Sequence, residues 1–488
     1  MWAKQARTKV VATVGPACRS QEMLRQLVQA GVDVFRFNMA HGSHEEHARS
    51  IATLRRVSQE LRRVVAVLVD LAGPKVRLLP LPEGQVELAA GEEVFLGGDS
   101  PEPNDAATLQ LGISHPQVLA QLSPGHRVLL ADGTVALQVE EPLPGGLRCR
   151  VIQGGTVASR QGVNFPGVRL GLPALTEKDL QDARWAAGQE VDFVGLSFVG
   201  GPEEIQQLRQ LLRQHGSSAA VVAKIERPEA LDHLERIVQE ADAVMVARGD
   251  LGVETDVAHM PLAQKRIILL CNQYQRPVIV ATQMLDSMRH APLPTRAEAT
   301  DVANAILDGA DACMLSGETA VGRYPLQAVE MMHRIAHSAE TAFAAGITRS
   351  GSFFRRQVVH PVTAALVESA VHIARQVQAR VIVVASHSGR TALALASYRS
   401  HVPVLGVSDQ QQVLRRLCLS WGVVPVPEAP AADSRRLAEF LRRQGLATGE
   451  LSPGDRLVML RGTRLGAVQN ILVVDEVGAA PDASPPGP

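Results

Sequence analysis

The sequence has no apolar run of about 18 residues, the length that a membrane-spanning helix requires. Its opening, MWAKQARTKVVATVG, lacks the long apolar segment of a secretory signal peptide. The five cysteines are scattered and form no CxxC pair, so neither a disulfide framework nor a zinc site is expected. We therefore expect a cytoplasmic protein that contacts no membrane.

An excess of charge of one sign is also missing. The net charge is −1 and the isoelectric point is near 7, so nucleic acid is not expected as a partner. Lysine is scarce, because only six of the 49 basic residues are lysines, at positions 4, 9, 75, 178, 224 and 265. Each retained lysine is a weak pointer to a place that needs a compact point charge.

A chain of 488 residues is too long for one typical core, so several domains are expected. Short apolar segments alternate with amphipathic stretches, at 8–15, 32–38, 64–70, 192–198, 219–225, 243–248, 277–282 and 311–316. Near-continuous apolar strands between helices are typical of a parallel sheet covered on both faces. Eight such units predict an α/β fold, the (β/α)8 TIM barrel, with an active site at the C-terminal ends of its strands.

The alternation breaks once, after the third segment. Residues 76–164 alternate apolar and polar side chains between turn signals, which predicts a small β-barrel domain inserted as a lid over the active-site face. The barrel would then comprise 1–75 and 165–342. Residues 343–477 predict a C-terminal α/β domain with a parallel or mixed sheet, and the tail 478–488 is expected to be disordered.

Acidic residues follow two neighbouring segments, with Glu226 after the fifth and Asp250 after the sixth. Two carboxylates with few other ligands suit Mg²⁺ or Mn²⁺, which take their remaining oxygens from substrate and water. A single acid at such a place is more often a helix cap or a solvated loop residue. Two acids on adjacent strands, beside a lysine and an arginine, favour a metal site.

Positive groups gather at the same strand ends. Arg36, Arg77 and Lys224 are expected to converge on the barrel mouth, where they match phosphate or carboxylate oxygens. The segment ARGDLG, residues 247–252, adds backbone N–H groups at the start of a helix. These groups predict a site for a small anion.

Two hydroxyl groups, those of Thr282 and Ser316, follow the last two segments and either transfer a proton or merely cap a strand end. With the metal and anion sites, they indicate a metal-dependent barrel enzyme. Its reaction would pass through an enolate or be a phosphoryl transfer, and the spacing of the residues does not distinguish the two.

Nine segments resemble those of the pyruvate kinase family, in its order and over nearly the whole chain: TKVVATVGPA, VFRFNMAHGSHEEH, GPKVR, GVNFPG, LPALTEKDLQD, AKIERPEAL, MVARGDLGVE, ATQMLDSM and PTRAEATDVANAILDGADACMLSGETAVGRYP. The resemblance implies transfer of a phosphoryl group from phosphoenolpyruvate to ADP, giving pyruvate and ATP. It also implies a barrel, a lid, an effector-binding C-terminal domain, and assembly into a homotetramer.

The resemblance implies roles for the residues at matching positions. Catalysis would fall to Lys224, Arg36, Thr282 and Ser316, with Lys224 neutralising the transferring phosphoryl group. The divalent metal would be held by Glu226 and Asp250. The substrate would contact Arg36, Lys224, Ala247, Arg248, Gly249, Asp250 and Thr282, and the nucleotide would contact Asn38, His41, Arg77 and Lys178.

The sequence departs from the family at the site where most members bind K⁺ through an Asn, a Ser, an Asp and a Thr. It keeps Asn38 and Asp70, but Ala40 and Leu71 replace the Ser and the Thr, and Lys75 replaces a usual Glu. The Leu and Lys together resemble the K⁺-independent branch, so we expect the ammonium to substitute for K⁺. The alternative is a solvated hinge lysine.

The C-terminal domain carries a second candidate site. The loop Ser386, His387, Ser388, Gly389, Arg390 and Thr391 lies between an expected strand and an expected helix and resembles the loop that binds a sugar-phosphate effector in regulated members. Residues 461–470 would close over it. An ordinary strand-to-helix turn is the alternative, and the effector could be fructose 1,6-bisphosphate, AMP or a pentose phosphate.

Two other functions fit part of the pattern. A pyruvate aldolase type of barrel shares the Glu and Asp pair, but it does not account for the lid, the MLSGET segment or the C-terminal domain. A catalytically inactive metabolite sensor would be expected to have lost Lys224 or a metal ligand, and the sequence retains them.

Overall fold

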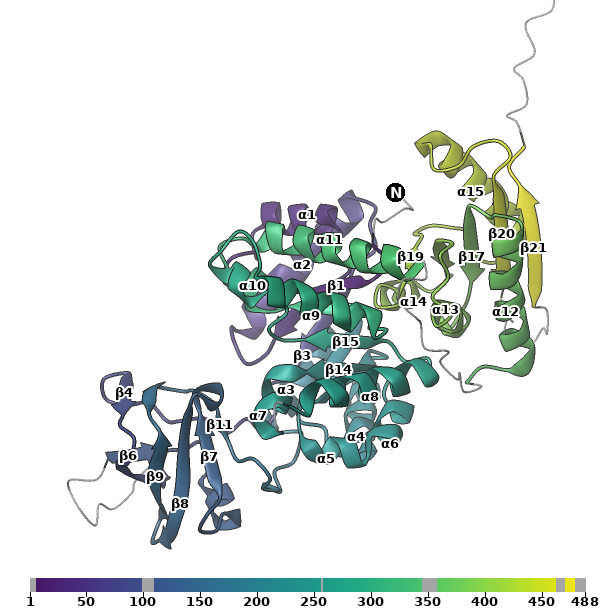
Figure 1. Ribbon diagram of the computed structural model, residues 1–488. Helices are drawn as coiled ribbons and strands as arrows, with labels where there is room; N and C mark the ends of the chain where they lie inside the picture. Colours follow the sequence, from purple (N-terminus) through teal and green to yellow (C-terminus); the bar gives the residue numbers. More distant parts are fainter. Residues whose placement is uncertain (1–5, 99–108, 256–257, 345–357, 462–469, 479–488) are drawn as a thin grey trace, which may run out of the picture.

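The computed structural model describes residues 6–98, 109–255, 258–344, 358–461 and 470–478. At its centre eight parallel strands close into a barrel (Figure 1). In chain order they are β1 (Lys9–Thr13), β2 (Val34–Asn38), β3 (Ala66–Asp70), β12 (Phe193–Leu196), β13 (Ala220–Ile225), β14 (Ala243–Ala247), β15 (Val278–Ala281) and β16 (Ala312–Leu315). All eight coincide with predicted segments, and the predicted barrel is confirmed.

Helices surround the barrel: α1 (Gln21–Ala30), α2 (His44–Glu60), α3 (Glu177–Gly188), α4 (Pro202–Gln214), α5 (Pro228–Asp232), α6 (Leu234–Glu240), α7 (Arg248–Glu254), α8 (Met260–Gln273), α9 (Arg296–Leu307), α10 (Gly317–Ala320) and α11 (Pro325–Ala344). Helices α2, α3 and α9 begin with capping boxes, in which a Ser or Thr and an acid three residues later exchange hydrogen bonds with the backbone. Local sequence therefore sets where these helices begin.

An aspartate precedes every second barrel strand, namely Asp33, Asp192, Asp242 and Asp311 before β2, β12, β14 and β16. Each carboxylate accepts an N–H from the neighbouring strand, donated by Val10, Val67, Val221 and Val278 over 2.8 to 3.0 Å. These bonds pin the register of four strand pairs at the N-terminal end of the barrel.

The lid lies beyond the opposite end of the strands. It contains a six-stranded sheet in the order β11 (Val163–Asn164), β7 (Arg127–Leu130), β8 (Val135–Leu143), β9 (Gly146–Gln153), β5 (Glu93–Gly97), β6 (Leu109–Gly112), and a pair formed by β4 (Gln85–Leu88) and β10 (Gly155–Ala158). The chain enters and leaves it side by side, because Val163 N–H donates to Val76 O over 2.9 Å and Leu78 N–H donates to Gln161 O over 2.8 Å.

The C-terminal domain has a five-stranded sheet in the order β19 (Val423–Pro425), β18 (Val404–Val407), β17 (Val381–Ala385), β20 (Arg456–Arg461), β21 (Ile471–Glu476). The last pair is antiparallel, so the sheet is mixed, within the predicted fold class. Its helices are α12 (Pro361–Gln376), α13 (Arg390–Ala396), α14 (Gln411–Leu417) and α15 (Ser434–Thr448). No helix among the described residues is long and apolar enough to span a membrane.

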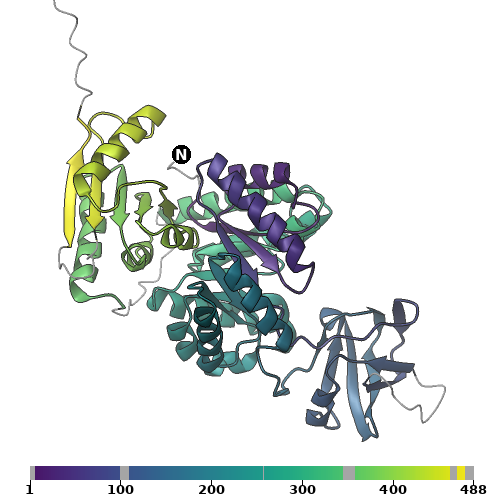
Figure 2. The same ribbon diagram turned by 180° about the vertical axis from the view of Figure 1, so that it is seen from behind.

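The C-terminal domain docks on the aspartate end of the barrel. Arg415 pairs with Asp192, and Arg399 pairs with Asp311 at 3.1 Å. Figures 1 and 2 both show the lid and the C-terminal domain at opposite ends of the barrel. The strand ends that carry the predicted site residues therefore face the lid.

Candidate active site

Four charged side chains meet at the C-terminal ends of β2, β3 and β13, and all are buried. Arg36 Nε donates to Asp70 Oδ2 over 2.7 Å. Lys224 Nζ lies 3.2 Å from Asp70 Oδ1 and 3.1 Å from Glu226 Oε1. The structure thus brings together two predicted cations, one predicted metal ligand and Asp70.

Burial and the charges of neighbouring side chains shift the pKa values in this cluster in opposite directions. Burial alone would raise the pKa of the Asp70 carboxyl, but Lys224 and Arg36 outweigh it and hold this pKa below its usual value. Burial would lower the pKa of Lys224, but Asp70 and Glu226 raise it. Burial dominates at Glu226, whose pKa is raised. Lys224 is therefore a permanent ammonium at neutral pH.

Ser197, which the sequence analysis missed, completes the surroundings of this ammonium. Its Oγ accepts from Lys224 Nζ over 2.7 Å and donates to Leu71 O over 2.7 Å. The ammonium thus donates a hydrogen bond to Ser197 and lies in ion-pair contact with Asp70 and Glu226. A polar residue directly after the fourth strand was the available signal.

Glycine leaves room for the Asp70 carboxylate. A Cβ at Gly195, on the neighbouring strand β12, would lie 2.6 Å from Asp70 Oδ1. Any side chain at this position would displace the carboxylate from Arg36 and Lys224. Gly195 is a second residue that the sequence analysis missed. The requirement for glycine at this position follows only from the strand register, which places it beside Asp70.

Asp250 lies in α7, beside Glu226. Its Oδ1 accepts from Lys75 Nζ over 2.6 Å, and its charge contributes to the raised pKa of Glu226. Glu226 Oε2 accepts from the backbone N–H of Phe198 over 2.7 Å. Among the described residues no three His, Cys, Asp or Glu side chains are grouped so that they could hold a metal ion. Two carboxylates fit Mg²⁺, which keeps several waters and takes other oxygens from phosphate.

The start of α7 is tied to Thr282. Gly249 N–H donates to Thr282 Oγ1 over 2.7 Å, and this hydroxyl donates to Ala281 O over 2.6 Å. Arg248 donates to Thr282 O over 2.8 Å and pairs with Asp301. The buried Arg248 side chain therefore holds the loop in shape, and the Thr282 hydroxyl is already engaged.

A cleft of about 540 Å³ opens beside the buried charges. It is lined by Arg36, Asn38, His41 and Ser316, among others. Burial lowers the pKa of His41, and the charges of Arg77 and Arg36 lower it further. Ser316 Oγ is buried and has no hydrogen-bond partner among the described residues. The cleft offers a cation, an amide, an imidazole and a free hydroxyl to a bound molecule.

Comparison with known proteins assigns the chain to a family. The family model for the barrel domain of pyruvate kinase matches residues 5–329, and that for the alpha/beta domain of pyruvate kinase matches residues 364–474. The chain belongs to the pyruvate kinase family. The pyruvate kinases of Staphylococcus aureus strains MRSA252 and USA300 are each 38% identical to it over 476 residues, which is 97% of this chain and 80% of each relative. The resemblance drawn from the motifs is confirmed.

Two residues that the resemblance to pyruvate kinases implies as nucleotide contacts, Lys178 and Arg77, do not line the cleft. Lys178 Nζ donates to Met39 O over 2.7 Å and pairs with Asp182, and its side chain is more than half exposed. Arg77 Nη1 donates to Arg160 O at the base of the lid. The charge of Arg77 still lowers the pKa of His41, which does line the cleft.

The residues at the family's K⁺ position are engaged by the protein itself. Asn38 Oδ1 accepts from Ala40 N–H over 3.1 Å, and the Leu71 carbonyl accepts from Ser197. Asp70 is held by Arg36 and Lys224. Within the described part of the chain, Lys75 forms its ion pair with Asp250, a predicted metal ligand, and not with Asp70.

The predicted effector segment 386–391 comprises the turn after β17 and the first two residues of α13, Arg390 and Thr391. Gly389 has φ +80°, and its N–H donates to Ser386 Oγ over 3.1 Å. His387 Nδ1 lies 2.8 Å from Asp409 Oδ1, while Ser388 and Arg390 are exposed. Most of the segment expected to close over the loop, 462–469, lies outside the described residues.

Proposed function

We propose that the protein is a pyruvate kinase, which transfers the phosphoryl group of phosphoenolpyruvate to ADP. The observation that carries the proposal is the buried ammonium of Lys224, which lies among three oxygens and shares Asp70 with Arg36, a residue that lines the cleft. A positive charge fixed in a water-poor site stabilises the charge of a transferring phosphoryl group far better than one in solvent.

Each part of the site has a task in this reaction. Arg36 presents a planar donor fork to the substrate phosphate, and Asp70 orients it by accepting from its Nε and Nη2. Glu226 and Asp250 would hold Mg²⁺ or Mn²⁺, which when bound supplies further positive charge to phosphate and enolate oxygens. We propose that the lid, residues 76–164, closes over the barrel and excludes water, so that ADP accepts the phosphoryl group.

A coupled assay tests the function directly. Phosphoenolpyruvate, ADP and Mg²⁺ are supplied, and pyruvate is detected by its reduction with lactate dehydrogenase. Turnover that requires all three is the expected result. Cleavage of a pyruvate-containing aldol without use of ADP would support the aldolase alternative, and no turnover with either substrate would support the inactive sensor.

Ser316 is the better of the two hydroxyls for protonating the enolate that remains after transfer. Its Oγ has no partner among the described residues, whereas the Thr282 hydroxyl already donates to Ala281 O. Replacing Ser316 by Ala is expected to slow exchange of the pyruvate methyl hydrogens with D₂O by about a hundredfold, the contribution of a general acid. Proton NMR measures this exchange. An unchanged exchange rate would remove Ser316 from the proton path.

We propose that activity does not require K⁺, because the Lys75 ammonium supplies a charge at the site. A unit charge at about 5 Å in an effective dielectric of about 20 contributes roughly 3 kcal/mol, so replacing Lys75 by Met should lower kcat/KM about a hundredfold. Assays in tetramethylammonium buffer, with and without KCl, measure both effects. Strong activation of the wild-type protein by KCl would contradict this proposal.

We also propose that a phosphorylated metabolite activates the enzyme through the loop 386–391. Ser388 in the loop and Arg390 at the start of α13 are both exposed, and the buried Ser386 hydroxyl accepts from Gly389 N–H. Replacing Ser388 by Glu would set a carboxylate against the phosphate and is expected to abolish activation by fructose 1,6-bisphosphate, AMP and pentose phosphates alike. Activation is measured at subsaturating phosphoenolpyruvate. A variant that is still activated by any of them would refute the site for that effector.

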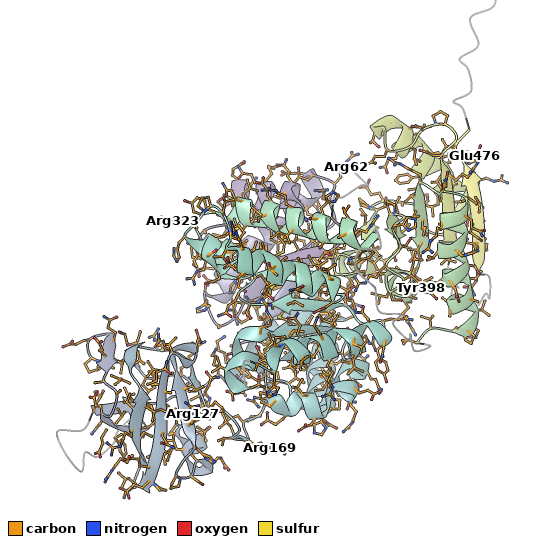
Figure 3. All side chains as sticks on the ribbon, viewed as in Figure 1. Arg62, Arg127, Arg169, Arg323, Tyr398 and Glu476 are labelled. Carbon is orange, nitrogen blue, oxygen red and sulfur yellow. The ribbon has the colours of Figure 1, made fainter. Side chains whose placement is uncertain are left out.

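Two surfaces support assembly into the proposed homotetramer. The edge strand β21 carries exposed Val473 and Val474, and Glu476 at its end points outward (Figure 3). Helix α8 exposes Leu262 and Leu269, at 65% and 41% of their surface. Unpaired edges and exposed apolar side chains favour contacts between copies. We place the enzyme, as part of glycolysis, in the cytoplasm.

A further inference from the structure

Each of the two proposed metal ligands forms an ion pair with its own lysine. Glu226 pairs with Lys224 at 3.1 Å, and Asp250 pairs with Lys75 at 2.6 Å. We propose that Lys75 is a built-in competitor of the divalent cation at Asp250, and that binding of the cation releases the hinge of the lid. The inference rests on the proposed assignment of Asp250 as a metal ligand.

The Lys75–Asp250 pair is well placed to compete. The side chains are only 24% and 21% exposed, so water screens their attraction incompletely. A cation held by the Asp250 carboxylate would repel the ammonium, which lies 2.6 Å from Oδ1 of the same group. The ion pair between Lys75 and Asp250 Oδ1 is therefore weakened, and the affinity for the metal is lowered by the part of its strength that is lost. The ammonium, once released from Asp250, still contributes its charge to the site.

Lys75 also lies where the lid is attached. It follows Gly73 and Pro74 in the entering segment, and the N–H of Gly73 is anchored by Asp179 Oδ1 over 3.0 Å. Its side chain packs on the leaving segment, because a Cβ at Gly162 would lie 2.9 Å from Lys75 Cε.

A second contact, a hydrogen bond, also joins the lid to α7, the helix that carries Asp250. Asn164 Nδ2, on the leaving segment, donates to Glu254 Oε1 over 2.8 Å. Glu254 ends α7, the helix that carries Asp250 near its start. Both lid connections are thus bound to α7, and only the Lys75 connection uses a residue that the metal would claim. Loss of this bond leaves the hinge held by the Asn164 contact and the Gly73 anchor.

Manganese binding to the full-length protein without substrates tests the competition, with free Mn²⁺ measured by electron paramagnetic resonance. Replacing Lys75 by Met, which keeps the length of the side chain and removes its charge, should tighten Mn²⁺ binding about fivefold or more. Replacing Lys265 by Met removes another lysine paired with a carboxylate, that of Asp308, and should change nothing. Unchanged or weaker Mn²⁺ binding by the Lys75→Met variant would overturn the proposal.

Hydrogen exchange measured by mass spectrometry tests the hinge. Saturating Mn²⁺ should speed amide exchange in peptides that cover residues 72–78 of the wild-type protein and leave the Lys75→Met variant unchanged. Equal responses of the two proteins would refute the release of the hinge.

The Asp250→Asn variant separates this inference from the metal assignment beneath it. If Mn²⁺ binds this variant as tightly as the wild type, the metal assignment is wrong and the inference fails with it. If Asn weakens binding but Met at position 75 does not tighten it, only the inference fails. Thermal unfolding of each variant shows that the fold is kept.

Discussion

Replacing Lys224 by Met should lower kcat for phosphoryl transfer by about a hundredfold to a thousandfold, the loss typical when one preorganised donor to a transition state is removed. Methionine keeps the length of the side chain and removes its charge. Arg36 remains, so binding of phosphoenolpyruvate should weaken much less than turnover. Steady-state kinetics with varied phosphoenolpyruvate separates kcat from KM.

Two further variants serve as a control and as an intermediate case for this prediction. The Lys265→Met variant loses an exposed lysine far from the strand ends and should keep the wild-type rate. The Ser197→Ala variant keeps the Lys224 charge but removes the hydroxyl that positions it, so an intermediate loss is expected. A Lys224→Met variant that folds and retains kcat within about tenfold of wild type would contradict the role given to the ammonium.

Replacing Asp192 by Ala should destabilise the protein by about 3 to 5 kcal/mol, the cost of breaking a buried ion pair from one side. The fully buried carboxylate accepts from Val67 N–H over 2.8 Å and from Arg55 over 2.7 Å, and it pairs with Arg415 of the C-terminal domain. Alanine leaves two guanidinium groups and one backbone N–H without this acceptor. The midpoint of urea unfolding measures the loss.

Asp242 offers a matched control, because it occupies the same position before another strand. It accepts from Val221 N–H and pairs with Arg209 of barrel helix α4, but its side chain is 34% exposed. The Asp242→Ala variant should therefore lose less, about 1 to 2 kcal/mol. Equal losses at the two positions would contradict the larger contribution expected from the full burial of Asp192 and its ion pair with Arg415.

The barrel could be predicted from sequence because its strands are buried on both faces. Segments such as the one at 64–70 are almost wholly apolar, and they are separated by helical patterns, which leaves few alternative folds. Arg36, Lys224 and Glu226 could be found for a related reason. Each stands at the end of such a segment, and parallel strands bring these ends together.

The partners within the site could not be predicted in the same way. Lys75 and Asp250 are 175 positions apart, and their contact depends on how the lid segment crosses the mouth of the barrel. Gly195 looks like an ordinary strand glycine until the register sets it beside Asp70. Such contacts follow from tertiary geometry, which no local pattern of residues encodes.

The paired entry and exit of the lid make it an exchangeable module. Val76 and Val163 are joined by a backbone hydrogen bond before the chain spreads into the lid, so the ends of the insertion stay together whatever lies between them. Domains whose ends are adjacent can be transplanted between hosts with little strain. The barrel could therefore accept inserted domains of other sizes without any change to the strands that hold Lys224.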